Sequence, residues 1–182
     1  MGARYIFLDR DGTINAEVCY LSRPEQVELL PGAAEGIKLL RKKGFYIIIV
    51  TNQSGIARGY FSESELSKIH DMLLKLLTAE GAFIDDIIYC PHHPQGKVPQ
   101  YAIKCDCRKP KTGMLVQAMQ KYNIDLTESY VIGDKLSDVE LAKNAGCKAI
   151  LVRTGYGKEI DVTKCNADNI SPDLLCAAQW VI

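Results

Sequence analysis

Five short apolar segments alternate with helical segments along this chain of 182 residues, and this order constrains the fold more than any other feature. We predict strands at residues 4–8, 45–50, 84–89, 130–132 and 149–152. These segments are apolar along most of their length, which is typical of strands buried on both faces. We predict helices at about residues 33–43, 62–80, 113–122, 136–145 and 172–180. The pattern indicates an α/β fold, a doubly wound, Rossmann-like parallel sheet with helices on both faces.

The composition is that of one packed domain, which we expect to span residues 1–182. The 22 basic and 22 acidic side chains cancel. No field of the whole protein therefore favours nucleic acid or an anionic membrane surface, and we expect neither as a partner. Any anion must therefore be bound by a local site. We also expect the protein to act as a monomer.

The first residues, MGARYIFLDRDG, show no basic region followed by a long apolar stretch and a small-residue cleavage site. The longest apolar runs, such as residues 46–50, are too short to span a bilayer. We therefore expect a cytoplasmic protein. In that compartment, seven cysteines point to thiols or metal ligands in preference to disulfides.

Acidic side chains follow two of the predicted strands. Asp9 and Asp11 come after the first strand, and Asp134 and Asp138 come after the fourth. In a doubly wound sheet these strands can be neighbours, which would bring the carboxylates together at one edge of the crevice. Clustered carboxylates repel one another unless a cation lies among them, and Mg²⁺ prefers oxygen ligands of this kind.

This arrangement suggests phosphoryl transfer through a covalent intermediate. A carboxylate such as Asp9 can attack phosphorus, and Asp11 can protonate the leaving oxygen and later deprotonate water. Thr51, at the end of the second strand, and Lys109 offer a hydroxyl and a positive charge to the phosphoryl oxygens. Asp-x-Asp after a strand is by itself often a simple turn. It is improbable, however, that chance places this motif, Thr51, Lys109 and the acidic pair after the fourth strand in this order along one chain.

Four segments in this order resemble the motifs of the haloacid dehalogenase superfamily of phosphatases. They are FLDRDGTIN (residues 7–15), VTNQSG (50–55), RKPK (108–111) and GDKLSD (133–138). The resemblance extends from about residue 4 to residue 157. The short gap between Asn15 and Pro31 leaves little room for a cap domain, so we expect a capless phosphatase of this superfamily.

The resemblance also implies roles for single residues. Asp9 is the nucleophile, Asp11 the acid and base, and Thr51 and Lys109 are phosphoryl ligands. Mg²⁺ is bound by Asp9, the Asp11 carbonyl and Asp134. Whether Asp138 touches the metal directly stays open.

The loop between the third and fourth strands, residues 90–111, is too long for a plain connection. It carries Cys90, His92, Cys105 and Cys107, a ligand set suited to structural Zn²⁺, with His93 as an alternative to His92. A bound ion would fix the loop so that the residues after Cys107 face the crevice. A solvent-exposed loop with incidental thiols is the competing interpretation.

The segments CPHHP, CDCRKPKTGM and TNQSGIARGYF resemble the zinc-containing branch of the superfamily. That branch includes phosphatases of a heptose bisphosphate, which serve activated-heptose and lipopolysaccharide-core synthesis, and phosphatases of histidinol phosphate. Residues 51–61 look more like the heptose enzymes, and histidinol phosphate is the alternative substrate. Positions that match substrate contacts in the heptose enzymes are Glu17, Val18, Cys19, Tyr20, Asn52, Gln53, Ser54, Arg108 and Lys135.

Two non-enzymatic interpretations compete with this one. A magnesium- or phosphate-binding protein with a degenerate active site would release no inorganic phosphate. A receiver domain also phosphorylates an aspartate on a parallel sheet, but the adjacent Asp11 and the zinc-type loop argue against it.

Overall fold

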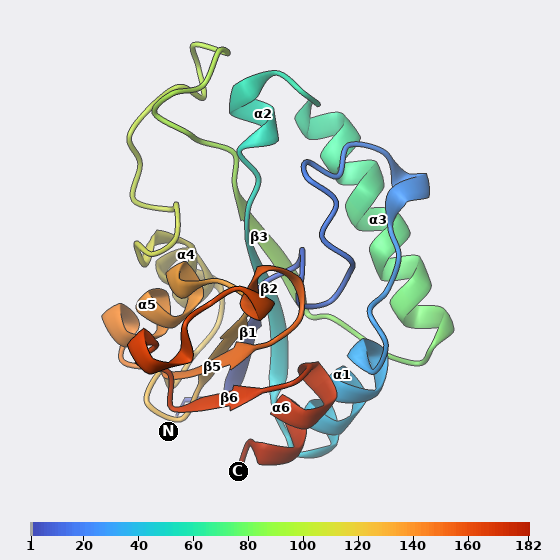
Figure 1. Cartoon of the computed structure of the whole chain (residues 1–182), viewed down its shortest axis with the longest axis vertical. Helices are drawn as coiled ribbons and strands as arrows, with labels where there is room; N and C mark the ends of the chain where they lie inside the picture. The colour runs from blue at the N-terminus through green and yellow to red at the C-terminus, as the bar shows by residue number, and fades with distance from the viewer. Residues whose placement is uncertain (1) are drawn as a thin grey trace.

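A computed structural model of the protein describes residues 2–182 and contains a six-stranded sheet in which every pairing is parallel (Figure 1). The strand order is β3-β2-β1-β4-β5-β6. The strands are β1 (Tyr5–Leu8), β2 (Tyr46–Asn52), β3 (Asp86–Cys90), β4 (Tyr130–Gly133), β5 (Lys148–Val152) and β6 (Asn169–Ser171). The predicted doubly wound parallel sheet is therefore confirmed.

The α-helices connect successive strands or follow the sheet. They are α1 (Ala33–Lys42), α2 (Gly55–Arg58), α3 (Glu63–Ala79), α4 (Gly113–Lys121), α5 (Leu136–Ala145) and α6 (Leu174–Trp180). Short 3₁₀ helices lie at η1 (Pro24–Gln26), η2 (Gly155–Lys158) and η3 (Val162–Lys164). Among residues 2–182, no helix combines the length and the apolar character that crossing a bilayer requires.

The predicted strands and helices are all present, and their ends shift by at most two residues. One α-helix and one strand were not predicted, the four-residue α2 and the edge strand β6, and neither were the three 3₁₀ helices. Both α2 and β6 are too short to show a periodic pattern, and β6 lies in a tail with weak sequence signals. The second strand was expected to end at residue 50, but β2 continues to Asn52 because this residue pairs with Cys90 of β3.

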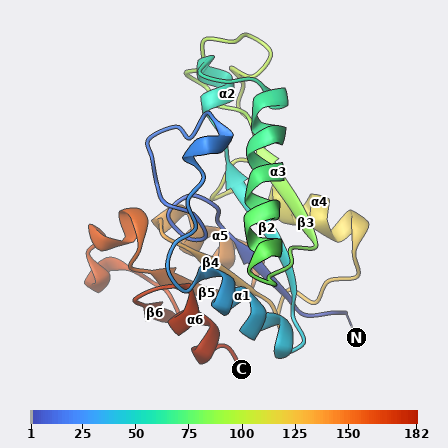
Figure 2. The same ribbon diagram turned by 90° about the vertical axis from the view of Figure 1, so that its right-hand side faces the viewer.

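Successive strand residues point to opposite faces of the sheet, and helices cover both faces, which explains why the strands are apolar along most of their length. Ile6 and Leu8 of β1 pack in one core with α1, α3 and α6, whereas Tyr5 and Phe7 pack in a second core with α4 and α5. In Figure 2, α1 and α3 lie in front of the sheet. The two cores hold the strands rigidly between helix layers.

The order of the strands reverses beside β1. This strand pairs with β2 on one side and with β4 on the other, where Leu8 is level with Ile132. The backbone N–H of Asp9 donates to the Ile132 carbonyl at 2.9 Å. The carboxyl ends of β1 and β4 therefore lie side by side, as expected, at the kind of point where α/β sheets bind ligands.

Ile48, fully buried in the middle of β2, tests the importance of the core between the sheet and α4–α5. We expect Ile48→Ala to lower the free energy of unfolding by about 2–5 kcal/mol, because it leaves a cavity in a packed core. Urea unfolding followed by circular dichroism measures the change. Val116→Ala on the exposed face of α4 is the control, with an expected change within about 0.5 kcal/mol. Equal stability of the two variants would contradict this placement of Ile48.

Candidate active site

Three buried carboxylates meet where β1 and β4 end. Asp9 follows β1, Asp134 follows β4, and Asp138 lies in the first turn of α5. Each offers an oxygen within 4.8 Å of the others, and each is nearly inaccessible to solvent. The structure thus brings Asp9 and Asp134 together and adds Asp138 to the same cluster.

Lys109 supplies a positive charge to this cluster. Its Nζ lies 2.9 Å from Asp9 Oδ1 and 2.6 Å from Asp138 Oδ1, and it donates to the Val50 carbonyl at 2.9 Å. Burial alone would favour the neutral amine, but the Asp138 and Asp9 carboxylates outweigh it and raise the pKa of Lys109. The ammonium group is therefore held against the predicted nucleophile.

The surroundings of Asp134 fit a bound cation. Its Oδ2 accepts a hydrogen bond from the Tyr156 backbone N–H at 2.8 Å, whereas its Oδ1 is buried and has no hydrogen-bond partner within residues 2–182. Burial and the charge of Asp9 raise the pKa of Asp134 to about 7. A divalent cation would satisfy this oxygen and restore the ionised form.

The backbone packs closely around the same carboxylate. A Cβ added to either Gly12 or Gly155 would lie 2.2 Å from Asp134 Oδ2, so only glycine fits at both positions. Asp138 has less capacity left for a metal, because Lys109 contacts its Oδ1 and the Lys135 backbone N–H donates to its Oδ2. Coordination of Mg²⁺ by Asp9 and Asp134 stays a prediction, and Asp138 is tied to Lys109 within the same cluster.

The side chain of Asp11 takes no part in the carboxylate cluster. Arg10 donates to both of its oxygens, at 3.0 and 2.8 Å, and Asn15 and Gln53 each donate to one. Although burial favours the neutral acid, Arg10 and the amide donors lower the pKa of Asp11 to about 2. The expectation that the Asp11 carboxylate joins the cluster is therefore wrong, and its backbone carbonyl stays the predicted metal ligand.

The side chains at the end of β2 lie beside Lys109. Thr51 is buried inside the strand and not in a following loop, because the strand continues to Asn52. Asn52 Oδ1 accepts from the Lys109 backbone N–H at 3.0 Å, and its Nδ2 donates to the Lys109 carbonyl at 3.3 Å. Asn52 therefore orients the segment that carries Lys109.

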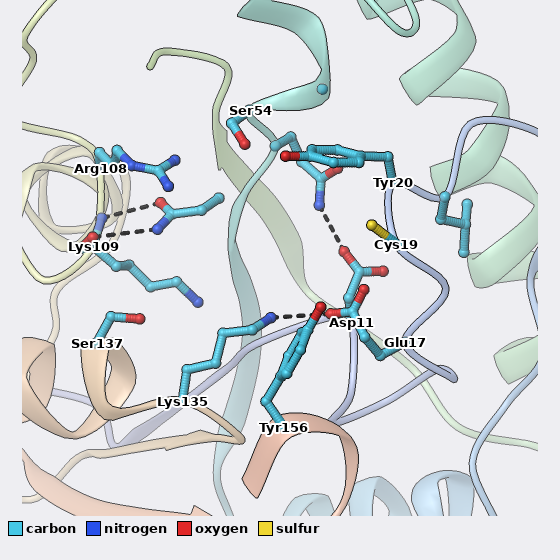
Figure 3. Close-up of a pocket in the computed structure, with 14 residues that line it drawn as sticks. Asp11, Glu17, Cys19, Tyr20, Ser54, Arg108, Lys109, Lys135, Ser137 and Tyr156 are labelled. Atoms are coloured by element: carbon cyan, nitrogen blue, oxygen red, sulfur yellow. Dashed lines mark hydrogen bonds and ion pairs between the residues drawn. The ribbon is translucent and has the colours of Figure 1, made fainter. Parts of the chain in front are cut away.

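A cavity of about 300 Å³ opens beside this constellation (Figure 3). Most of the predicted substrate contacts line it: Glu17, Cys19, Tyr20, Asn52, Gln53, Ser54, Arg108 and Lys135. Val18 does not line this cavity. The lining also includes residues that were not predicted, namely Leu21, Gly55, Ser137 and Tyr156.

Tyr156 and Arg10 were not predicted as site residues, but both contact residues that were. Tyr156 binds Asp134 through its backbone, and its ring lies 5.0 Å from Lys135 Nζ. Tyr156 follows β5, and a position beyond the carboxyl end of a parallel strand indicates a residue near the ligand site. Arg10 is the largest charged side chain that is fully buried, and its position between Asp9 and Asp11 was the corresponding signal.

The cavity contains opposite charges on facing walls. In Figure 3, Arg108 and Lys109 lie across the cavity from Glu17 and Tyr20. Lys135 Nζ lies 3.1 Å from Glu17 Oε2 and 3.9 Å from Asp9 Oδ2. Although burial would lower the pKa of Lys135, Asp9, Asp134 and Glu17 raise it, so this side chain stays cationic and available to an anion.

Four soft ligands meet in the loop after β3. The Cys90 Sγ lies 3.0 Å from Cys107 Sγ and 3.5 Å from Cys105 Sγ, and His92 Nδ1 lies 3.3 Å from Cys107 Sγ. All four ligand atoms lie within 4.8 Å of one another. Three thiols and one imidazole in this arrangement suit tetrahedral Zn²⁺.

His93 is not part of this cluster. Its Nε2 lies 3.3 Å from Arg58 Nη2, and its Nδ1 accepts from the Gln95 backbone N–H at 3.1 Å. Of the two histidines left open by the sequence, the structure therefore selects His92.

The cluster lies next to the cationic wall of the cavity. Arg108 directly follows Cys107, and its Nη1 donates to the His92 carbonyl at 3.4 Å. Lys109 comes next in the chain. A metal that fixed His92 and Cys107 would thereby fix the backbone that presents both cations.

Comparisons with known proteins agree with this geometry. Residues 106–178 match a hydrolase-like family model described as HAD-hydrolase-like. A D-glycero-beta-D-manno-heptose-1,7-bisphosphate 7-phosphatase of Haemophilus ducreyi is 46% identical over 85% of this chain and 86% of its own. The protein of the same name from Escherichia coli K12 is 42% identical over 97% of this chain and 87% of its own. The D,D-heptose 1.7-bisphosphate phosphatase of B. bronchiseptica, solved with magnesium and phosphate, has a TM-score of 0.86 and 34% identity, covering 97% of this chain and 96% of its own.

Zinc content tests the cysteine cluster. We expect the purified protein to carry about one zinc ion per chain and Cys107→Ser to carry almost none, because one of four ligands is lost. Activity should fall about tenfold or more, since Arg108 and Lys109 lose their support. Mass spectrometry of the metal and phosphate release measure the two effects. His93→Ala, outside the cluster, should keep its zinc. Full activity in a zinc-free Cys107→Ser protein would refute the supporting role of the loop.

Proposed function

The chain belongs to the HAD-like hydrolases, in the family of the heptose-1,7-bisphosphate 7-phosphatases, and we propose that it removes the 7-phosphate of D-glycero-D-manno-heptose 1,7-bisphosphate. The observation that carries the proposal is a buried carboxylate cluster beside a cavity in which one wall carries the cations Arg108 and Lys109. The cluster suits attack on one phosphate, and the wall suits retention of another. The reaction would serve the synthesis of activated heptose.

The first half of the proposed reaction transfers the phosphoryl group to the enzyme. Mg²⁺, held by Asp9, Asp134 and the Asp11 carbonyl, would supply positive charge against the phosphoryl oxygens. An Asp9 carboxylate oxygen attacks phosphorus, and the bond from phosphorus to the sugar oxygen breaks. Asp11 gives its proton to that leaving oxygen, while Lys109 and Thr51 stabilise the charge on the transferred group.

The second half releases inorganic phosphate. Asp11, now a carboxylate, takes a proton from water as the water oxygen attacks phosphorus. The bond from phosphorus to Asp9 breaks and regenerates the free carboxylate. Arg10 and the amide donors lower the pKa of Asp11, which favours the ionised form that this step uses. The proton that Asp11 gains from water is the one it gives to the leaving oxygen in the next turnover.

Substrate selection is assigned to small loops. The segment between Asn15 and Pro31 forms a loop with the short helix η1 and supplies Glu17, Cys19 and Tyr20 to the cavity. A bisphosphate needs a cationic anchor away from the reacting phosphate, and a guanidinium can bind phosphate through two hydrogen bonds. Arg108 is the anchor we propose, with Lys135 closer to Asp9.

We also propose that residues 1–182 act as one phosphatase domain, as a monomer and in the cytoplasm. The single sheet with two helix-covered cores supports the first of these proposals. Gel filtration with light scattering tests the second.

A substrate panel tests the proposed function. With Mg²⁺, we expect fast phosphate release from D-glycero-D-manno-heptose 1,7-bisphosphate, with the 1-phosphate retained in the product, and little release from histidinol phosphate. Phosphorus NMR identifies the position that is cleaved. Asp9→Asn should lower turnover by at least about a thousandfold, because the nucleophile is lost. Preference for histidinol phosphate, or an active Asp9→Asn protein, would overturn the proposal.

Arg108→Ala tests the second phosphate site. We expect KM for the bisphosphate to rise roughly tenfold or more, because charge-assisted hydrogen bonds are lost, while KM for heptose 7-phosphate changes little. Steady-state kinetics with both substrates measure the difference. Lys104→Ala, which removes a nearby exposed charge outside this cavity, is the matched control. Equal effects of Arg108→Ala on the two substrates would argue against the anchor.

A further inference from the structure

The carboxylate of Asp11 is held by more donors than any other side chain of the site. Arg10 Nε and Asn15 Nδ2 donate to Oδ1, each at 3.0 Å. Arg10 Nη2 and Gln53 Nε2 donate to Oδ2, at 2.8 and 2.9 Å. A carboxylate has about four acceptor positions, so these bonds fix its orientation as well as its place.

Gln53 differs from the other two residues that donate to this carboxylate. Arg10 and Asn15 belong to the same loop as Asp11, whereas Gln53 follows β2 and approaches from another strand. Its Nε2 also donates to Thr51 Oγ1 at 2.9 Å. One amide nitrogen therefore joins the predicted acid and base to a predicted phosphoryl ligand. Gln53 is almost completely buried, which limits the freedom of this link.

We propose that Gln53 is a positioning residue that fixes the Asp11 carboxyl group relative to Thr51. This role is distinct from the substrate contact that its place on the cavity wall suggests. In the proposed reaction, Thr51 binds the transferred phosphoryl group, and Asp11 must reach the leaving oxygen on that group. The two must keep one relative geometry while the bond between phosphorus and oxygen breaks.

The dependence of the rate on the leaving group of the phosphate ester distinguishes positioning of Asp11 from other roles of Gln53. This inference rests on the proposed phosphatase chemistry. When an alkyl phosphate transfers its phosphoryl group to Asp9, the departing alkoxide needs the Asp11 proton. A p-nitrophenolate leaves as a stable anion and needs almost no protonation. A loosely held Asp11 therefore slows alkyl phosphates selectively, whereas weaker phosphoryl binding slows both kinds of ester.

The experiment compares kcat/KM of the full-length protein with Mg²⁺ for an alkyl phosphate and for p-nitrophenyl phosphate. Gln53→Met keeps the length of the side chain and removes both amide donors. We expect kcat/KM to fall roughly 10- to 100-fold for the alkyl ester and less than about threefold for the aryl ester. Asp11→Asn is the reference and should show the same selectivity with a larger loss. Gln117→Met, the same substitution at an exposed position of α4 outside this cavity, should leave both values unchanged.

Two results would overturn the proposal. An equal fall for both esters would mean that Gln53 acts through phosphoryl binding alone, and a rise in KM confined to the sugar bisphosphate would mean a substrate contact. Zinc content and the unfolding midpoint verify that the variant is folded. If Gln53→Met does not fold, Gln53→Asn takes its place, because its side chain is too short to reach both Asp11 and Thr51. We expect the same selective loss of kcat/KM for the alkyl ester. Any alkyl phosphate that the parent protein hydrolyses serves here, so a wrong sugar assignment would not disturb this test.

Discussion

The crowding of three carboxylates at the ends of β1 and β4 is the constraint on which the rest of the site depends. Parallel pairing of these strands places Asp9 and Asp134 side by side, and the first turn of α5 adds Asp138. Such a group is unstable in a dry interior unless positive charge enters it. Lys109 supplies one charge and contacts Asp9 and Asp138. Within residues 2–182, the buried Oδ1 of Asp134 accepts no hydrogen bond, and Lys135 Nζ lies 3.7 Å away. A divalent cation at this oxygen would complete the balance.

The need to place Lys109 accurately gives the cysteine loop a physical purpose. The chain between Cys90 and Gly113 contains no helix or strand in the described structure, so regular hydrogen bonding cannot hold it in position. Fixing an unsupported segment of this length in one conformation would cost considerable conformational entropy. The meeting of Cys90, His92, Cys105 and Cys107 leaves only Arg108 between the cluster and Lys109, and Asn52 holds the Lys109 backbone from the other side. A catalytic cation is thereby fixed without a secondary-structure element of its own.

Much of this architecture could be predicted from the sequence because strand burial and motif order are local signals. The continuous apolar strands predicted the parallel sheet, and the residues after β1 and β4 predicted the acidic cluster except for the Asp11 side chain, which lies outside it. What the sequence could not decide depends on tertiary contacts. His92 and His93 are equivalent by spacing, and only the path of the loop separates them. Tyr156 contacts Asp134, a residue that folding brings near it, so no periodic pattern reveals this contact.

The distribution of burial explains why the chemistry was easier to predict than the substrate. Asp9, Asp134 and Lys109 are nearly inaccessible and are fixed by strand ends or by several contacts each, so their identities are tightly constrained. Tyr20 and Arg108 lie on loops, are more exposed, and face the cavity. Loop residues of this kind can change without disturbing the sheet, so specificity in such folds varies with the loops while the chemistry stays with the strand ends. For this reason the reaction follows from the fold and its strand ends, whereas the sugar was assigned with the help of relatives that share the loops.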